Sequence, residues 1–205
     1  MGYKDKLNDD KKMQLLVLQQ GEKLLNYEEN IFLYLCFSIL SQQLSVKVAS
    51  IIRQRFLDLY PIPEPTPKMV LETPIEDFRK IGFSMAKANY VQNVARFALE
   101  QGMDNEKLNV LTDEEVILYL TQIKGVGRWT TEMLLLFALK RENVFAVDDL
   151  GIQTAMNKLY GISIDNKKQM KMDMLKIAEQ WEPYRSYACL YLWGYKDSKP
   201  DKNPQ

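Results

Sequence analysis

A tight turn with two glycines, Lys124-Gly125-Val126-Gly127, is the stretch whose residue types first suggest chemistry. Glycines carry no side chain, so backbone N–H groups can approach a ligand there, and the helix expected from Arg128 adds the positive end of its dipole. This combination suits a phosphate group. A turn between two helices also favours glycine, so the pattern alone fits both a phosphate site and a plain connection.

Two adjacent carboxylates, Asp148 and Asp149, follow the short apolar segment 144–147 and precede another helical stretch. The chain has no histidine, which removes the usual general base and argues against zinc catalysis. Any chemistry must therefore run on carboxylates. A carboxylate at a helix start is kept ionised by the helix dipole, but aspartates in this place are also common N-caps.

A polar step, Ser41-Gln42-Gln43, separates two apolar stretches, and Ser45 follows it. One interpretation is a corner between two helices, in which Ser45 caps the second. The other is a polar loop exposed for binding, because side-chain amides both donate and accept hydrogen bonds.

These residues must be positioned by helices, because apolar residues recur at helical spacing and no segment alternates like a strand. Thr73-Pro74-Ile75-Glu76 predicts a short capped helix that stops before Gly82, and the prolines of 61–67 predict a stiff connector. The other expected helices lie near 13–18, 31–40, 45–60, 85–100, 112–123 (with a Thr112/Glu115 capping box), 128–140, 149–161, 166–180 and 184–195.

The length and composition of the chain limit which classes of protein it can belong to. The 205 residues, 46% of them hydrophobic, suffice for one large domain or two small lobes. Lysine plus arginine and aspartate plus glutamate each number 27, so nucleic-acid binding would need a local basic face or backbone contacts. Cys36 and Cys189 lie in apolar helical patterns and are expected to be buried free thiols. The charged start and the lack of a long apolar run predict a soluble intracellular protein, cytoplasmic or nucleoid-associated in a prokaryote and nuclear in a eukaryote.

Three separated motifs carry a resemblance to a known family. The string Leu120–Thr131 resembles the helix-hairpin-helix of the HhH-GPD DNA glycosylase superfamily, in which an aspartate, matched here by Asp149, follows the second helix. Ile39–Ser45 resembles the minor-groove loop of the alkyladenine branch. Trp181–Trp193 resembles the C-terminal helix of the 3-methyladenine DNA glycosylase II proteins, and 78–83 with Lys87 supports the fold.

The resemblance implies an all-α, two-lobed helix-hairpin-helix fold with the active cleft between the lobes. The whole chain, 1–205, would be one catalytic core without the N-terminal β-rich domain of the bacterial enzyme. We expect a central lobe at about 28–105. A hairpin lobe would comprise about 106–195 together with the N-terminal helix 11–27, and 196–205 would form a flexible tail.

The resemblance also implies a function and a set of site residues. The expected activity is hydrolytic excision of alkylated, cationic purines such as 3-methyladenine and 7-methylguanine from double-stranded DNA. Asp149 would stabilise positive charge on the sugar and orient water, with Asp148 as a structural cap or neighbour. Lyase-type relatives place a lysine where this chain has Trp129, so no strand cleavage is expected. The implied base pocket is Trp129, Met133, Trp193 and Tyr191, and the implied DNA contacts are Gln42, Gln43 (the plug for the vacated base), Ser45, Lys124, Gly125, Val126, Gly127 and Thr130.

One further departure, a candidate ion site and two alternative functions accompany this prediction. Met133 replaces an aromatic pocket residue of the bacterial enzyme, which weakens stacking. The backbone carbonyls of Thr121, Ile123 and Val126 match positions that hold Na⁺ or K⁺ in relatives, and no cofactor is otherwise expected. The protein is predicted to be a monomer without a membrane partner. A glycosylase for a neutral lesion (hypoxanthine or an oxidised purine) and a non-catalytic helix-hairpin-helix DNA-binding module remain as alternatives.

Overall fold

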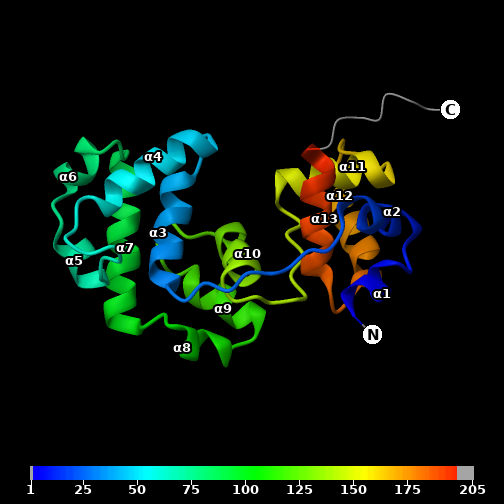
Figure 1. Ribbon diagram of the computed structural model, residues 1–205, viewed down its shortest axis with the longest axis horizontal. Helices are drawn as coiled ribbons and strands as arrows, with labels where there is room; N and C mark the ends of the chain where they lie inside the picture. Colours follow the sequence, from blue (N-terminus) through cyan, green and yellow to red (C-terminus); the bar gives the residue numbers. More distant parts are fainter. Residues whose placement is uncertain (1, 198–205) are drawn as a thin grey trace. The chain divides into compact units, whose positions relative to one another are not determined.

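The computed structural model describes residues 2–197, and every regular element among them is a helix (Figure 1). The expected all-α class is confirmed. The chain divides into two compact units. We call Tyr27–Leu139 the central unit, and the described parts of Met1–Asn26 and Lys140–Gln205 the terminal unit. Most of the expected tail, 198–205, lies outside the described residues.

The central unit is built around the apolar helix α3 (Ile31–Ser41), against which α7 (Met85–Gln101) packs. Its core includes a ring cluster in which Phe56, Phe78 and Phe83 stack with centroids 5.5–6.1 Å apart. These rings are almost fully buried, so they supply much of the apolar area that stabilises the unit. The remaining helices of the unit are α4 (Val46–Leu57), α5 (Pro67–Glu72), α6 (Ile75–Lys80), α7 (Met85–Gln101), α8 (Asn105–Asn109), α9 (Asp113–Leu120) and α10 (Arg128–Phe137).

The terminal unit joins the first helices of the chain to the last. Helix α13 (Arg185–Asp197) packs against both α2 (Lys11–Gln20) and α11 (Leu150–Tyr160), so segments more than a hundred residues apart share one core. Tyr191 of α13 is fully buried, and its hydroxyl donates to the carbonyl of Gly21 at 2.7 Å. The other elements are α1 (Tyr3–Leu7), α2 (Lys11–Gln20), α11 (Leu150–Tyr160), α12 (Lys167–Ala178) and the 3₁₀ turn η1 (Glu179–Trp181).

A buried carboxylate joins three parts of the terminal unit. Asp10 caps α2 by accepting from the Lys12 N–H at 2.9 Å. Its second oxygen accepts from the Tyr160 hydroxyl at 2.6 Å and from the Gln180 and Trp181 side chains at 3.1 Å each. The N-terminal helix is therefore held to α11 and η1 by charge-assisted hydrogen bonds as well as by packing.

The units part at a different position from the expected one. We expected a boundary near residue 105, with the hairpin in the same lobe as the C-terminal helices. The structure keeps the hairpin in the central unit and parts the chain at 139/140. The reason is packing: α10 contacts α3, and the Glu28 N–H donates to the carbonyl of Ala138 at 3.0 Å. The N-terminal helix α2 lies in the same unit as the C-terminal helix α13 and contacts it.

The expected cap at Thr73 is wrong. Helix α6 begins after Pro74 without a side-chain cap, and Thr73 instead ends α5. Its hydroxyl donates to the carbonyl of Met69 at 2.8 Å and pairs with the Tyr60 hydroxyl at 3.1 Å. A threonine hydroxyl that bonds back to its own preceding turn cannot cap the next helix.

Other element predictions differ in extent rather than kind. The capping box of Thr112 and Glu115 is confirmed, with the Thr112 N–H donating to the Glu115 carboxylate at 2.8 Å. The first hairpin helix ends at Leu120 rather than near 123, and the second ends at Phe137 rather than at 140. Sequence reasoning missed three short helices, α1, α5 and α8, and α5 shortens the stiff connector expected at 61–67.

Both cysteines are buried free thiols, as expected, and burial raises the pKa of the Cys36 thiol far above its usual range. Among the described residues, no helix combines the length and apolar character needed to cross a membrane.

Candidate active site

The hairpin turn has the backbone conformation that its glycines suggested. Gly125 has φ 110°, and a Cβ there would lie 2.3 Å from Cγ of Tyr90, so both conformation and space require glycine. The Val126 N–H donates to the carbonyl of Ile123 at 2.9 Å, and the Asn93 amide donates to the carbonyl of Lys124 at 3.1 Å. Gly127 caps α10 without a side chain, and the space beside its Cα is open. The first N–H groups of α10 therefore face a side from which a ligand can approach.

The hairpin offers backbone N–H groups to a ligand, whereas its arginine, Arg128, is bound to carboxylates of the protein. The Arg128 guanidinium donates to the Glu132 carboxylate at 3.0 Å and to both carboxylate oxygens of Glu114. Hydrogen bonding to Arg128 lowers the pKa of Glu114, which keeps that carboxylate charged and paired. Arg128 is thus held by protein carboxylates. Thr130 is 3% exposed and lines a cavity, so a DNA contact by Thr130 stays a prediction.

The polar loop after α3 is held by a lysine that sequence reasoning treated as fold support only. Lys87 Nζ donates to the carbonyls of Leu40 and Gln42 at 2.8 and 2.7 Å. The Lys87 ammonium is partly buried, and this burial lowers its pKa. Gln43, between the anchored Gln42 and Leu44, has φ 59°. Lys87 lies in the first turn of α7, where the helix dipole disfavours a cation. A lysine at this unfavourable position was the sequence feature that could have indicated a specific contact.

Ser45 has the structural role that was the alternative to DNA contact. Its hydroxyl accepts from the Val48 N–H at 3.4 Å and caps α4. It does not line the cavity described below, whereas Gln42 and Gln43 do. Capping and DNA contact are not exclusive, so a DNA contact by Ser45 stays a prediction.

The strained backbone of Gln43 gives a test of its side chain. Gln43→Gly should leave the fold intact or stabilise it, because glycine adopts positive φ without cost, whereas Gln43→Ala retains the strain. Both variants lose the amide. We expect both to weaken binding to duplexes with an abasic site by roughly tenfold and to leave binding to intact duplexes nearly unchanged, as fluorescence anisotropy can measure. Equal weakening on both duplexes would contradict a plugging role.

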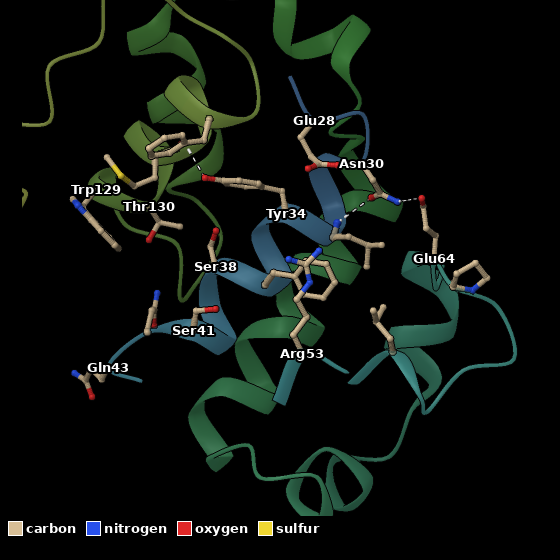
Figure 2. A pocket seen from close by; sticks show the side chains of 17 residues that line it. Glu28, Asn30, Tyr34, Ser38, Ser41, Gln43, Arg53, Glu64, Trp129 and Thr130 are labelled. Atoms are coloured by element: carbon tan, nitrogen blue, oxygen red, sulfur yellow. Dashed lines mark hydrogen bonds between the residues drawn. The ribbon is translucent and has the colours of Figure 1, made fainter. Parts of the chain in front are cut away.

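One face of α3 forms the floor of a cavity of about 890 Å³ in the central unit. Figure 2 shows Trp129, Thr130 and Gln43 at one end, with Tyr34 and Ser38 farther along. Trp129 is 42% exposed, which leaves its ring available to a ligand. Met133 also lines the cavity, so the structure brings together five predicted residues, which are Gln42, Gln43, Trp129, Thr130 and Met133.

Tyr34 and Ser38 are cavity residues that sequence reasoning missed. The Tyr34 hydroxyl donates to the carbonyl of Met133 at 3.0 Å, which joins α3 to α10. Burial raises the pKa of Tyr34 to about 12; the bond with Ser38 opposes this rise and the charge of Glu28 adds to it. The phenol therefore stays neutral at physiological pH. The signal was present in the sequence, because polar residues recur every four positions, at 30, 34, 38 and 42, along an otherwise apolar helix.

A carboxylate that accepts two hydrogen bonds on one oxygen occupies the start of α11 in the terminal unit. Oδ1 of Asp149 accepts from the Ile152 N–H at 2.9 Å and from the Trp193 indole N–H at 2.8 Å. Gly151 makes room for this arrangement. A Cβ on Gly151 would lie 2.9 Å from Oδ1 of Asp149 and 3.0 Å from Cδ1 of Trp193. The glycine is thus the residue that lets the indole reach the carboxylate.

Two predicted roles near this carboxylate are corrected. Asp148 is not the cap of α11: Asp149 is, and Asp148 pairs instead with Lys171 at the surface. Tyr191 cannot wall a base pocket, because its side chain is fully buried against the N-terminal segment. Residues two apart on a helix point about 200° apart, so Tyr191 and Trp193 could not both face one site.

The contact between Trp193 and Asp149 should control how well the carboxylate is positioned. Trp193→Phe removes the donor, and Gly151→Ala should displace the indole by its added methyl group. If the reaction uses Asp149, each variant should slow single-turnover base excision by roughly tenfold while thermal stability changes little. The double variant should be no slower than the slower single one, because both changes break the same contact. Additive losses would show that the two residues act separately.

Comparison with known proteins shows the family of this chain. Residues 36–181 match the family model of the HhH-GPD superfamily base excision DNA repair proteins. The chain belongs to this family.

Within this family, the chain is similar to proteins named 3-methyladenine DNA glycosylases. DNA-3-methyladenine glycosylase 1 of Schizosaccharomyces pombe is 37% identical over 174 residues, which cover 84% of this chain and 73% of the relative. The Bacillus subtilis protein YfjP is 34% identical over 161 residues, and the match covers 76% of this chain but only 55% of that relative. The solved structure of the S. pombe 3-methyladenine DNA glycosylase in complex with abasic DNA has a TM-score of 0.83 at 34% identity, covering 93% of this chain and 94% of that one.

Proposed function

We propose that this protein is a monofunctional DNA glycosylase that extrudes alkylated, cationic purines from double-stranded DNA and releases them by hydrolysis. The observation that carries the proposal is the Asp149 carboxylate, fixed at a helix start by the Ile152 N–H and the Trp193 indole. The similarity to proteins named 3-methyladenine DNA glycosylases supports the choice of substrate.

The chemistry follows from the charge that develops on the sugar. As the bond between C1′ and the base nitrogen breaks, its electron pair leaves with the base and the sugar becomes oxocarbenium-like. The Asp149 carboxylate stabilises this positive charge. A water oxygen then bonds to C1′ and its proton is released, so the products are an abasic site and a free base. A cationic purine leaves as a neutral base and needs no general acid, which fits a chain without histidine.

Extrusion of the base costs a few kcal/mol, and the central unit offers three compensating contacts. The first N–H groups of α10, with no side chain at Gly127, bind a backbone phosphate. Gln43 fills the space that the base leaves. Trp129, an exposed ring in the wall of the cavity, stacks on the base, and a cation over an aromatic face is favoured by about 0.5 to 2 kcal/mol.

Base release from three duplexes tests the proposal. Methylated DNA, a hypoxanthine duplex and an 8-oxoguanine duplex are incubated with the protein, and the released bases are identified by chromatography. We expect 3-methyladenine and 7-methylguanine from the first and little from the others. Release of a neutral base alone would replace the proposed substrate, and binding without release would indicate a DNA-binding module.

A trapping experiment distinguishes water from an amine nucleophile. Lesion DNA and borohydride should give no covalent adduct, because Trp129 stands where lyases carry lysine and an indole cannot form a Schiff base. The strand should remain intact with an abasic site. A lyase of the same fold serves as the positive control, and a robust adduct with this protein would overturn the water mechanism.

We further propose that a monovalent cation binds the carbonyls of Thr121, Ile123 and Val126 when DNA is bound. Carbonyl oxygens suit such an ion, and the Ile123 carbonyl, which accepts one hydrogen bond, has a second lone pair. The described residues contain no side-chain cluster suited to a metal ion. Replacing Na⁺ and K⁺ with tetramethylammonium should weaken DNA binding at constant ionic strength. We also propose that the protein acts as a monomer, which sedimentation with and without DNA tests.

A further inference from the structure

The cavity along α3 is longer than a single base requires. Its lining follows one face of that helix from Asn30 at the N-cap through Phe37 to Ser41, a span of about 16 Å at 1.5 Å per residue. Its volume of about 890 Å³ lies near the upper end of the range for pockets that enclose drug-sized ligands. A methylated purine held by Trp129 fills only one end.

The two ends of the cavity differ in chemistry (Figure 2). Trp129 and Gln43 mark the base end. The opposite half, which we call the distal half, carries Glu28, Asn30, Arg53 and Glu64. We assign to it two further lining residues, Leu57, one helical turn after Arg53 on α4, and Pro63, which precedes Glu64. It combines apolar surface with two carboxylates and one guanidinium, so its net charge is negative.

Contacts within the protein orient the groups of the distal half. The Asn30 amide donates to the Glu64 carboxylate at 2.7 Å, while its oxygen accepts from the Leu33 N–H at 3.0 Å. The Arg53 guanidinium lies over the Phe37 ring, 3.8 Å from the centroid. The backbone of Glu28 is anchored at its N–H by Ala138. The Glu64 carboxylate is therefore oriented by Asn30, and the exposed Glu28 carboxylate extends from an anchored backbone.

We infer that the distal half receives the substituent of purine adducts larger than methyl, and in particular aminoalkyl chains that end in a cationic amine. This inference rests on the proposed function. Apolar surface of Leu57 and Pro63 accommodates the chain, and the carboxylates of Glu28 and Glu64 face the amine. Anionic substituents are disfavoured by the same charge.

The first test compares duplexes carrying N7-methylguanine and N7-(aminohexyl)guanine. Wild-type protein should release both bases at similar single-turnover rates. Leu57→Trp, which fills the distal half, should slow release of the aminohexyl base by roughly tenfold or more and leave methyl release within about twofold. Pro63→Trp repeats the test from an exposed loop, where folding is not at risk, and Leu99→Trp on α7 is the control.

The outcomes separate the inference from the proposed function. Release of 7-methylguanine without release of the aminohexyl base overturns the inference and leaves the function standing. Equal slowing of both substrates by Pro63→Trp also overturns it. Release of neither base contradicts the function itself.

The second test addresses charge. Glu28→Gln should slow release of the aminohexyl adduct by about threefold relative to a hydroxyhexyl adduct of equal length, an effect of the size usual for exposed ion pairs that should shrink at high salt. Glu106→Gln, an exposed carboxylate on α8 outside the cavity, should change neither. If Glu28→Gln slowed release of the charged and the uncharged adduct equally, the Glu28 carboxylate would not select for the charged substituent, and this part of the inference would be wrong.

Discussion

Asp149→Asn should slow excision of 7-methylguanine by about a hundredfold or more while the protein stays folded and still binds lesion DNA. The substitution removes the negative charge but retains an oxygen at the Oδ1 position. That oxygen can still accept from the Ile152 N–H and the Trp193 indole, and asparagine is as good an N-cap as aspartate. Only the transition state carries the charge that the carboxylate stabilises, so the loss should appear in the single-turnover rate and not in affinity.

The neighbouring residue provides the matched control. Asp148→Asn removes the same charge one residue earlier, where it pairs with Lys171 at the surface. Surface pairs contribute little, so both excision and stability should remain close to wild type. If Asp148→Asn were the slow variant and Asp149→Asn near normal, the assignment of the catalytic carboxylate would be reversed.

Asp10→Ala should lower the free energy of unfolding of the terminal unit by about 3 to 5 kcal/mol, a change large enough to threaten the native state. The Asp10 carboxylate is 8% exposed, and it accepts from three side chains and caps α2. Its removal leaves the Tyr160 hydroxyl and the Trp181 indole N–H as buried donors without this acceptor. Burial, together with Asp10, raises the pKa of Tyr160 well above its usual range, so the phenol remains a donor at any physiological pH.

Urea unfolding followed by circular dichroism measures the effect. Asp10→Asn should retain the cap of α2 but present an amide to the other donors, so its loss should be intermediate. Asp9→Ala, an exposed neighbour, is the control and should change the unfolding free energy by less than about 0.5 kcal/mol. A loss for Asp10→Ala no larger than that control would show that the carboxylate is dispensable.

Sequence alone determined the features whose hydrogen bonds are local. The hairpin was readable because its glycines and the following helix are contiguous, and the Thr112–Glu115 box and the Ser45 cap each span three residues. The helix start at this position was readable for the same reason, since Asp149 accepts from the Ile152 N–H three residues on, although we expected Asp148 to be the cap.

Only the tertiary structure decided which groups from distant parts of the chain form hydrogen bonds with these residues. The indole that holds Asp149 comes from 44 residues away, the lysine that holds Gln42 from 45, and the donors to Asp10 from 150 to 171. The resemblance placed Tyr191 in a base pocket, and helical periodicity could not correct this, because it shows that a face is apolar but not what it packs against. The division between the units differs from the expected lobe boundary for the same physical reason: α10 packs against α3, and no local pattern encodes that partner.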